Sequence, residues 1–219
     1  MTNKEFIIDN IRDINTGVPI YISDLAAKLA EKDGIDEKKA SAAVSVAMKR
    51  IMDKGLCPKL RIYQKGIYYL AEETPFGETG INKELLIQHK YLSPDIGYET
   101  GYAALYHFGL TTQMPGERVL VTNRAKDCQR LDETLGVYVR PPKVEVTAEN
   151  KDYLQVLDVL ELMEKAPVDN SDPYGRVADI LIQYNLKYSM LLALAEHYYP
   201  QNLIFQIAHT ATAAEGVNG

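Results

Sequence analysis

The sequence predicts an α+β protein: an N-terminal winged helix-turn-helix followed by a mixed α/β domain with a helical C-terminal part. Three observations predict it. Apolar residues recur at helical spacing three times before residue 55, two β-rich stretches follow directly, and long helical periodicity returns only after residue 150. The 219 residues, 46% hydrophobic and 25% charged, are typical of a globular protein. We expect three regions: residues 1–75, 76–148 and 149–219.

The first two helices are predicted from apolar spacing and from the residues at their ends. A helix over residues 3–13 is followed by the breaker segment 16–19, which contains glycine and proline. A second helix is expected over residues 24–32, with Ser23 as its N-cap and Gly34 closing it.

The third helix is expected over residues 37–54, with Asp36 as its N-cap and Gly55 as a left-handed stop. After Gly55 the pattern changes to two β-rich stretches, 56–62 and 66–70, joined by a tight turn, so a hairpin is predicted. Three helices and a hairpin within about 70 residues form the element order of a winged helix-turn-helix.

A segment rich in Gly, Pro, Thr and acidic residues, 71–80, has no periodicity and marks a domain boundary. Beyond it, the apolar pattern predicts helices over residues 83–91 and 101–108, and strands over residues 118–122, 137–140 and 143–147.

Helical periodicity then returns for the rest of the chain. We expect one helix over residues 151–165 and a long one over residues 176–199, with a break near Asn185. Pro200 ends the second, and the small polar residues 210–219 are expected to be frayed.

Charge is distributed unevenly along the chain. The net charge is -6, but residues 1–75 hold twelve bases and eleven acids, whereas residues 76–219 hold twelve bases and nineteen acids. Residues 38–65 hold eight bases and a single acid, Asp53, a net charge of +7. A basic segment on an acidic chain suggests that this part of the protein meets a polyanion.

Composition also restricts the compartment. No apolar run approaches the ~18 residues of a membrane span, and the first ten residues carry acids where a signal peptide needs an apolar stretch. Cys57 and Cys128 form neither a disulfide framework nor the paired spacing of a zinc site. We therefore expect a cytoplasmic protein that contacts no membrane and holds no metal.

The basic segment places a polar stripe on the third helix. Lys38, Ser41, Ser45 and Lys49 stand at i, i+3, i+7 and i+11, opposite the apolar positions. Lysines beside small hydroxyl groups allow a helix to lie close in a DNA major groove, where both can reach base edges or phosphates.

The predicted hairpin adds two more bases to this surface. Arg61 and Lys65 would lie near the DNA backbone that flanks the helix. The alternative interpretation is an ordinary solvated face, which is what most charged helix stripes are. The helix order, the net charge of +7 and the basic hairpin favour DNA contact.

Catalytic motifs are absent: the sequence contains no GxxxxGK[ST], GxGxxG, HExxH, GxSxG or CxxC. His107 stands between two aromatic residues in a predicted helix, so we expect it to be packed or half-buried rather than a ligand. The polar residues 111–113, Asn123 and Arg124 either line a cleft or satisfy backbone groups at the ends of elements. We expect a non-enzymatic protein without a cofactor.

Two parts of the sequence resemble a known family. ISDLAAKL, AVSVAMKRIMDKGL and KGIYYL, between residues 22 and 70, resemble the N-terminal winged helix of AbiEi-type antitoxins of bacterial type IV toxin–antitoxin systems. GYETGYAALYHFGLTTQMP followed by VLVTN resembles the segment that follows the winged helix in that family. Together the two matches cover residues 19–124, just under half the chain.

The resemblance implies a transcriptional regulator that binds inverted repeats in double-stranded DNA at its own promoter, and that also neutralises a nucleotidyltransferase-type toxin without forming a stable complex. A homodimer would match the two halves of such a repeat. The DNA-binding roles fall on Lys38, Lys39, Ser41, Ser45, Lys49, Arg50, Arg61 and Lys65. One departure from the family pattern is the acidic turn 33–37, which argues against phosphate contact at that point.

An alternative is a protein-interaction module in which the winged helix is only a scaffold, because a fold does not by itself establish a function. In that case the acidic region 76–219 would meet a basic partner, again without enzymatic activity.

Overall fold

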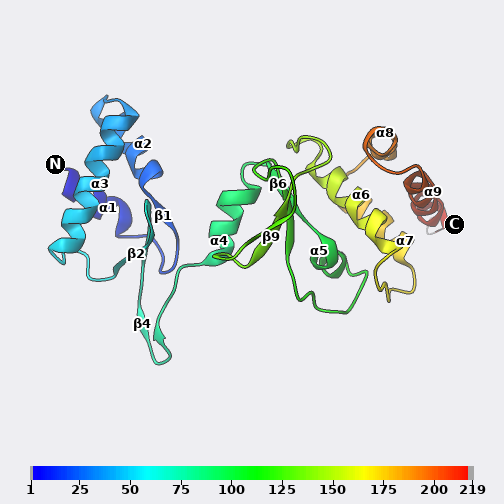
Figure 1. Cartoon of the computed structure of the whole chain (residues 1–219), viewed down its shortest axis with the longest axis horizontal. Helices are drawn as coiled ribbons and strands as arrows, with labels where there is room; N and C mark the ends of the chain where they lie inside the picture. The colour runs from blue at the N-terminus through cyan, green and yellow to red at the C-terminus, as the bar shows by residue number, and fades with distance from the viewer. Residues whose placement is uncertain (1, 217–219) are drawn as a thin grey trace. The chain divides into compact units, whose positions relative to one another are not determined.

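The computed structural model describes residues 2–216 and has an α+β fold (Figure 1). The chain divides into two compact units, the N-terminal unit Met1–Leu86 and the C-terminal unit Ile87–Gly219. The division falls at Leu86 rather than at residue 75. Residues 87–148 and 149–216 share one hydrophobic core, so the expected separation at residue 149 is absent from the described chain.

Three helices open the N-terminal unit: α1 (Asn3–Ile11), α2 (Ile22–Asp33) and α3 (Glu37–Asp53). Gly34 ends α2 in the left-handed region at φ 61°, as predicted. The predicted N-cap Ser23 is wrong, because α2 begins at Ile22, two residues before the expected start at residue 24, and Tyr21 is the N-cap. The backbone N–H of Ile22 is bound by the Gly66 carbonyl, and Ser23 donates instead to the Asp24 carboxylate.

A small antiparallel sheet completes the three-helix arrangement. Its strands are β1 (Ile20–Tyr21), β2 (Leu60–Gln64) and β3 (Ile67–Leu70), in the order β1-β3-β2. The predicted hairpin is therefore present, although its first strand begins at Leu60 rather than at residue 56. The inward-facing side chains Leu60, Tyr68 and Leu70 join the apolar faces of all three helices in one core.

The segment predicted to be an irregular boundary contains a second, two-stranded hairpin. It is formed by β4 (Glu73–Thr74) and β5 (Gly77–Glu78), which pair antiparallel around a short turn. Helix α4 (Lys83–Ile87) follows and continues as one π-helical turn, η1 (Gln88–Leu92), which matches the helix expected over residues 83–91.

The sheet of the C-terminal unit has four strands in the order β6-β7-β9-β8. They are β6 (Gly97–Thr100), β7 (Val119–Thr122), β8 (Arg130–Asp132) and β9 (Val137–Arg140). Only the β7–β9 pair is parallel. Strands β7 and β9 match two of the predicted strands. The strand expected over residues 143–147 is wrong, because the Asn123 side chain bonds the backbone N–H and carbonyl of Val146 in place of a neighbouring strand.

Five α-helices accompany this sheet: α5 (Gly101–His107), α6 (Lys151–Met163), α7 (Pro173–Gln183), α8 (Tyr188–Tyr198) and α9 (Asn202–Gly216). The break expected near Asn185 within residues 176–199 is confirmed: α7 and α8 are separate helices, and Asn185 between them has a φ of 53°. Residues 210–216 are helical rather than frayed, and residues 217–219 lie outside the described chain. Among the described residues, none of the helices is long and apolar enough to cross a membrane.

Candidate functional site

Helix α3 separates its apolar and polar residues onto opposite faces. Its buried residues are Ala40, Val44, Ala47, Met48 and Ile51. Of the predicted stripe, Lys38, Ser45 and Lys49 are exposed and Ser41 is half-buried. The Ser45 hydroxyl donates to the Ser41 carbonyl at 2.8 Å, so its proton is already used within the helix.

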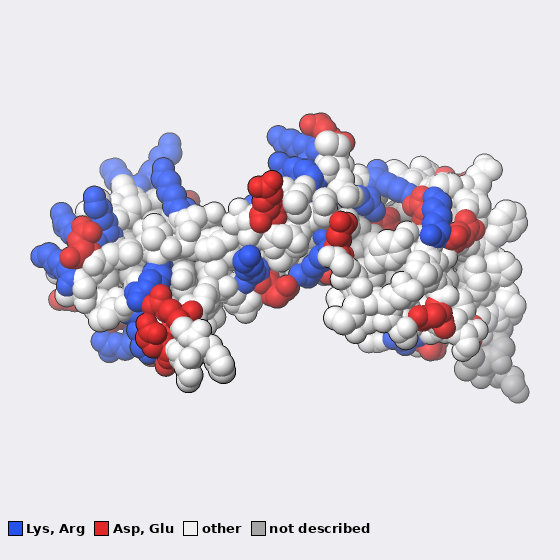
Figure 2. Space-filling model, turned by 60° about the horizontal axis from the view of Figure 1, so that its bottom comes forward, with Lys and Arg blue, Asp and Glu red and all other residues white. Residues whose placement is uncertain are grey.

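Five of the predicted DNA-binding cations remain available on the surface. Lys38, Lys39, Lys49, Arg50 and Lys65 are exposed, and none of them forms an ion pair with another described residue. Figure 2 shows Lys and Arg side chains gathered over the N-terminal unit, at the left of the view, with acidic side chains among them. Four of the five cations lie on α3 and the fifth lies at the β2–β3 turn.

Arg61, the remaining predicted DNA-binding cation, is bonded within its own unit. Its Nε donates to Glu78 at 3.1 Å and its Nη2 forms a second, shorter bond to the same carboxylate. Its Nη1 donates to the carbonyls of Pro58, at 2.7 Å, and Leu60, at 3.0 Å. These bonds to Glu78 raise the pKa of the Arg61 guanidinium. The structure thus gives Arg61 the role of joining β2 to the β4–β5 hairpin.

The acidic side chains of the turn before α3 cap the helix or pair with an adjacent lysine. Asp36 accepts from the Lys38 backbone N–H at 3.0 Å, which confirms it as the N-cap. Asp33 pairs with Lys32 at 3.4 Å. Glu37 lies in the first turn of α3, where its negative charge interacts favourably with the helix dipole. Asp36 and Glu37 therefore stabilise the start of the helix that carries the cations.

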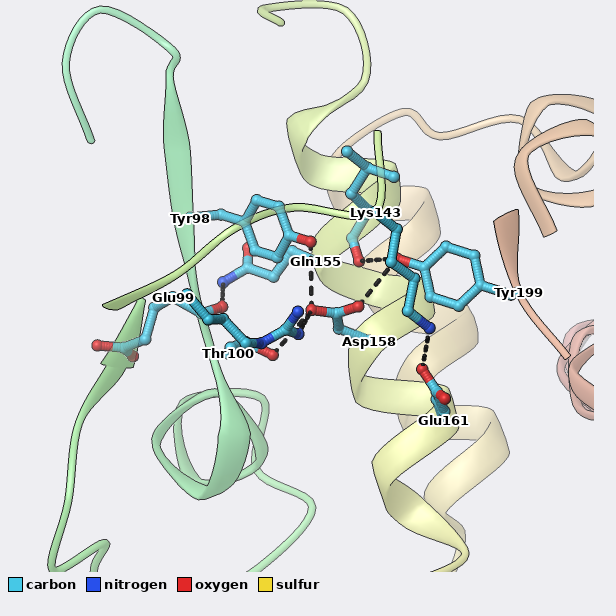
Figure 3. A network of polar contacts seen from close by, with 10 residues as sticks. Tyr98, Glu99, Thr100, Lys143, Gln155, Asp158, Glu161 and Tyr199 are labelled. Carbon is cyan, nitrogen blue, oxygen red and sulfur yellow. Dashed lines mark hydrogen bonds and ion pairs between the residues drawn. The ribbon is translucent and has the colours of Figure 1, made fainter. Parts of the chain in front are cut away.

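The C-terminal unit contains a buried polar network that the sequence did not predict. Asp158, with a side chain only 2% exposed, accepts from Arg140 at 2.5 Å, Thr100 at 3.0 Å and Tyr98 at 3.2 Å through one oxygen. Its other oxygen accepts from Tyr199 at 2.9 Å. In Figure 3 the two tyrosines point at Asp158 from two sides. A lone acid one turn after buried Leu154 was the available signal.

Asp158 is saturated by these four donors. Burial raises the pKa of both Tyr98 and Tyr199, and the charge of Asp158 raises both further, so the two phenols stay protonated as donors. Lys143 closes the network by pairing with Glu161 at 2.5 Å and lying 3.8 Å from the Tyr199 ring centre. The network links β6, β9 and α6 to the end of α8.

A cavity of about 310 Å³ borders this network and has walls of mixed charge. Arg140 and Lys165 contribute positive charge, while Glu117 and Glu161 contribute negative charge. Asp158 already accepts four hydrogen bonds, which occupy the lone-pair positions of a carboxylate. The arrangement supports a structural interpretation of the network.

The other polar residues predicted as candidates are bonded to nearby groups. Thr112 bonds Asp169 through both its N–H and its hydroxyl, and Thr111 accepts from the Gln113 backbone N–H. Asn123 bonds the backbone of Val146. The expectation that His107 is packed or half-buried is wrong: its side chain is 62% exposed, with Nδ1 2.5 Å from a Glu99 carboxylate oxygen. Among the described residues no group of three or more His, Cys, Asp or Glu side chains is placed to hold a metal ion.

The similarity of this chain to known proteins gives no information about the roles of these residues. No family model matches the chain, and no curated protein matches it. A solved structure that is similar is described as the RV2827C protein from Mycobacterium tuberculosis. The two share 14% sequence identity with a TM-score of 0.43, over 97% of this chain and 80% of that one. A likeness at this level carries no argument about function.

Proposed function

We propose that the protein is a DNA-binding transcriptional regulator that represses its own promoter, with an antitoxin-like C-terminal unit of a type IV toxin–antitoxin system. In this proposal the N-terminal unit is a winged helix-turn-helix, α3 is the recognition helix and the β2–β3 hairpin is the wing. The observation that carries the proposal is the set of five exposed, unpaired cations on α3 and the β2–β3 turn.

The dimensions and packing of α3 support this assignment. With side chains an α-helix is about 10–12 Å in diameter, which fits a major groove about 12 Å wide. The 17 residues of α3 extend about 25 Å along such a groove. Its opposite face is anchored in the core by five buried side chains. The helix can therefore approach DNA without disturbing its own packing.

The same cations predict how binding depends on salt. Each phosphate contact that displaces a counterion contributes about -0.9 to the slope of log K against log salt. Five contacts in each protomer give about -4.5, and a homodimer on an inverted repeat gives about -9. A slope near zero would exclude phosphate contact by this surface.

The partner proposed for the C-terminal unit is a nucleotidyltransferase-type toxin, which need not form a stable complex. The support is the resemblance of residues 97–123 to the family segment and the acidity of the region 76–219. Growth rescue tests this role: expression of the full chain is expected to restore growth to cells that express the toxin encoded next to it. Full toxicity in the presence of the folded protein would contradict the proposal.

Charge reversal on α3 tests the DNA-binding role. Lys49→Glu/Arg50→Glu is expected to abolish the mobility shift of DNA from upstream of the protein's own gene. The matched control is Lys126→Glu/Arg130→Glu, which reverses two exposed cations that form no ion pair with a described residue of the C-terminal unit. Equal binding by wild type and the α3 variant, or equal loss in both variants, would contradict recognition through α3.

A second candidate function is a protein-interaction module that uses the same fold as a scaffold. One observation favours it: Phe76, at the tip of the β4–β5 hairpin, is fully exposed between the acidic strand residues Glu73 and Glu78. An apolar ring flanked by acids suits a protein partner better than DNA. Phe76→Ser would then prevent co-purification with the product of the adjacent gene while leaving DNA binding unchanged.

A further inference from the structure

The exposed face of α3 contains apolar residues as well as cations. Ala42 is exposed, and Val46, four residues later, is 50% exposed. Residues four apart are neighbours on a helix surface, so these two side chains form one continuous apolar strip. The strip lies on the face opposite buried Val44 and Ala47, and it is therefore no part of the core.

Unpaired cations border this strip on both sides. Lys38 and Lys49 lie along one border, one turn before Ala42 and one turn after Val46. Lys39 and Arg50 lie in the same way along the other border. All four cations are exposed. Across the helix face the order is therefore cation, apolar side chain, cation.

This order fits the cross-section of a DNA major groove. Phosphates run along both edges of the groove, and the C5 methyl group of thymine is the apolar group that base pairs present at its floor. A protein partner would instead have to cover a small apolar strip while neutralising a cation row on each side. The charges therefore favour DNA as the occupant of this face.

We propose that Val46, supported by Ala42, contacts thymine methyl groups and makes the protein select thymine at one or two positions in each half of its binding site. This inference rests on the DNA-binding function proposed above. It adds a direct reading of base identity, whereas the cations alone provide attraction that is independent of sequence.

The test compares thymine with deoxyuridine, which lacks only the C5 methyl group. A binding site is first selected from randomised duplexes with the full-length protein, and each thymine is then replaced singly by deoxyuridine. Burial of one methyl group corresponds to about a fourfold change in the binding constant. Wild type is expected to lose about fourfold at one or two positions of each half-site and nothing elsewhere.

Val46→Ala, combined with the deoxyuridine replacement, completes a double-mutant cycle. This variant lacks the side-chain methyl groups of Val46, so it should bind the thymine and deoxyuridine sites equally at those positions. Ile182→Ala, which shortens an exposed apolar side chain of the C-terminal unit, is the matched control and should keep the fourfold preference. Thermal unfolding of each variant checks that the fold is unchanged.

The outcomes separate this inference from the function on which it rests. If wild type binds DNA but deoxyuridine costs nothing at any position, the thymine contact is overturned and the DNA-binding function stands. The thymine contact is likewise overturned if Val46→Ala keeps the thymine preference. It is also overturned if Val46→Ala weakens binding to a protein partner and leaves the selection of DNA sequence unchanged. If wild type selects and binds no DNA at any salt concentration, the proposed function itself fails.

Discussion

Five cations of the N-terminal unit, on α3 and at the β2–β3 turn, face solvent without an acidic partner, whereas four cations of the C-terminal unit are each held by a carboxylate. The unpaired cations are Lys38, Lys39, Lys49, Arg50 and Lys65. The paired ones are Lys90 with Asp132, Arg140 with Asp158, Lys143 with Glu161 and Lys151 with Asp95.

The paired cations have a structural role within their own unit, whereas no contact among the described residues accounts for the five unpaired ones. A cation bonded to a carboxylate at 2.5 to 2.7 Å orients strands and helices within its own unit. A cluster of exposed like charges makes no such contacts within its unit, and its members repel one another. Its proposed function is therefore to attract a molecule of opposite charge. The C-terminal unit also has exposed cations that form no ion pair with a described residue, such as Lys126 and Arg130. The comparison therefore supports the proposed polyanion contact only through the grouping of five such cations on α3 and the adjoining turn.

Removal of the buried Asp158 carboxylate should have the largest effect, on the stability of the C-terminal unit. Asp158→Ala leaves the Arg140 guanidinium and three hydroxyl groups without their acceptor. Breaking a buried pair costs about 3 to 5 kcal/mol, and we expect about 3 kcal/mol because the Arg140 side chain is 27% exposed. Urea unfolding followed by circular dichroism measures the change in the free energy of unfolding.

The matched control for this prediction is Glu145→Ala, in which an exposed acid of the same unit is removed. Surface substitutions of this type change stability by less than about 0.5 kcal/mol. If Asp158→Ala lost no more stability than Glu145→Ala, the network would not stabilise the unit, and the contrast between the two units would break.

Neutralising two unpaired cations should have the next largest effect, on DNA affinity. In the proposed complex, Lys49→Gln/Arg50→Gln removes two phosphate contacts from each protomer. For each protomer this lowers affinity about 30-fold at 0.15 M salt and reduces the magnitude of the salt slope by about 1.8. Stability should not change, because neither cation is paired with a described residue. Fluorescence anisotropy at several salt concentrations measures both quantities, with Lys126→Gln/Arg130→Gln as the control. An unchanged slope would contradict the assignment of these cations to phosphates.

The Asp132 carboxylate predicts a smaller effect that depends on pH. Burial favours a higher pKa for this group, but bonds from Lys90, Tyr91 and the Leu135 backbone N–H outweigh it and lower the pKa below the usual value. The ionised form is therefore stabilised by folding, and this stability is present above about pH 4 and lost as the pH falls through the lowered pKa.

Asp132→Asn tests this linkage directly. The variant should lose about 1 to 2 kcal/mol of unfolding free energy at pH 7, because the donors that bond the carboxylate then face an uncharged amide. The difference from wild type should narrow as the pH falls through the lowered pKa of Asp132, because the wild-type carboxyl then also becomes neutral. Urea unfolding of both proteins at neutral pH and in this acidic range provides the measurement. A difference that stayed constant with pH would show that the Asp132 charge plays no part.

Local signals in the sequence predicted the N-terminal unit well. Helix α3 lies where its apolar spacing, the Asp36 cap and the Gly55 stop indicate, because each signal acts within a few residues. Ser23 failed as a cap because its helix start depends on Gly66, which is more than forty residues away in the chain. The exposed face of α3 follows from the same periodicity, whereas the internal bonds of Arg61 do not.

Long-range contacts limited the prediction of the C-terminal unit. Strand β6, with the sequence GYET, carries no alternating pattern, and it is defined by its pairing with β7 about twenty residues later. Asp158 finds its partners at Tyr98, Arg140 and Tyr199, which no local rule brings together. Even so, a lone acid on the apolar face of α6 indicates that a partner must exist.

Arg61 provides the smallest and most discriminating test of the contrast between paired and unpaired cations. The sequence grouped it with the DNA-binding cations, but the structure pairs it with Glu78. Arg61→Gln should therefore leave the salt slope of DNA binding unchanged, whereas Lys65→Gln, on the same hairpin, should reduce its magnitude by about 0.9 in each protomer. Because the Arg61–Glu78 pair is exposed to solvent, its loss should change stability little. Equal reductions of the slope by both variants would show that Arg61 leaves Glu78 to bind a phosphate, and that pairing within a unit does not predict which cations meet DNA.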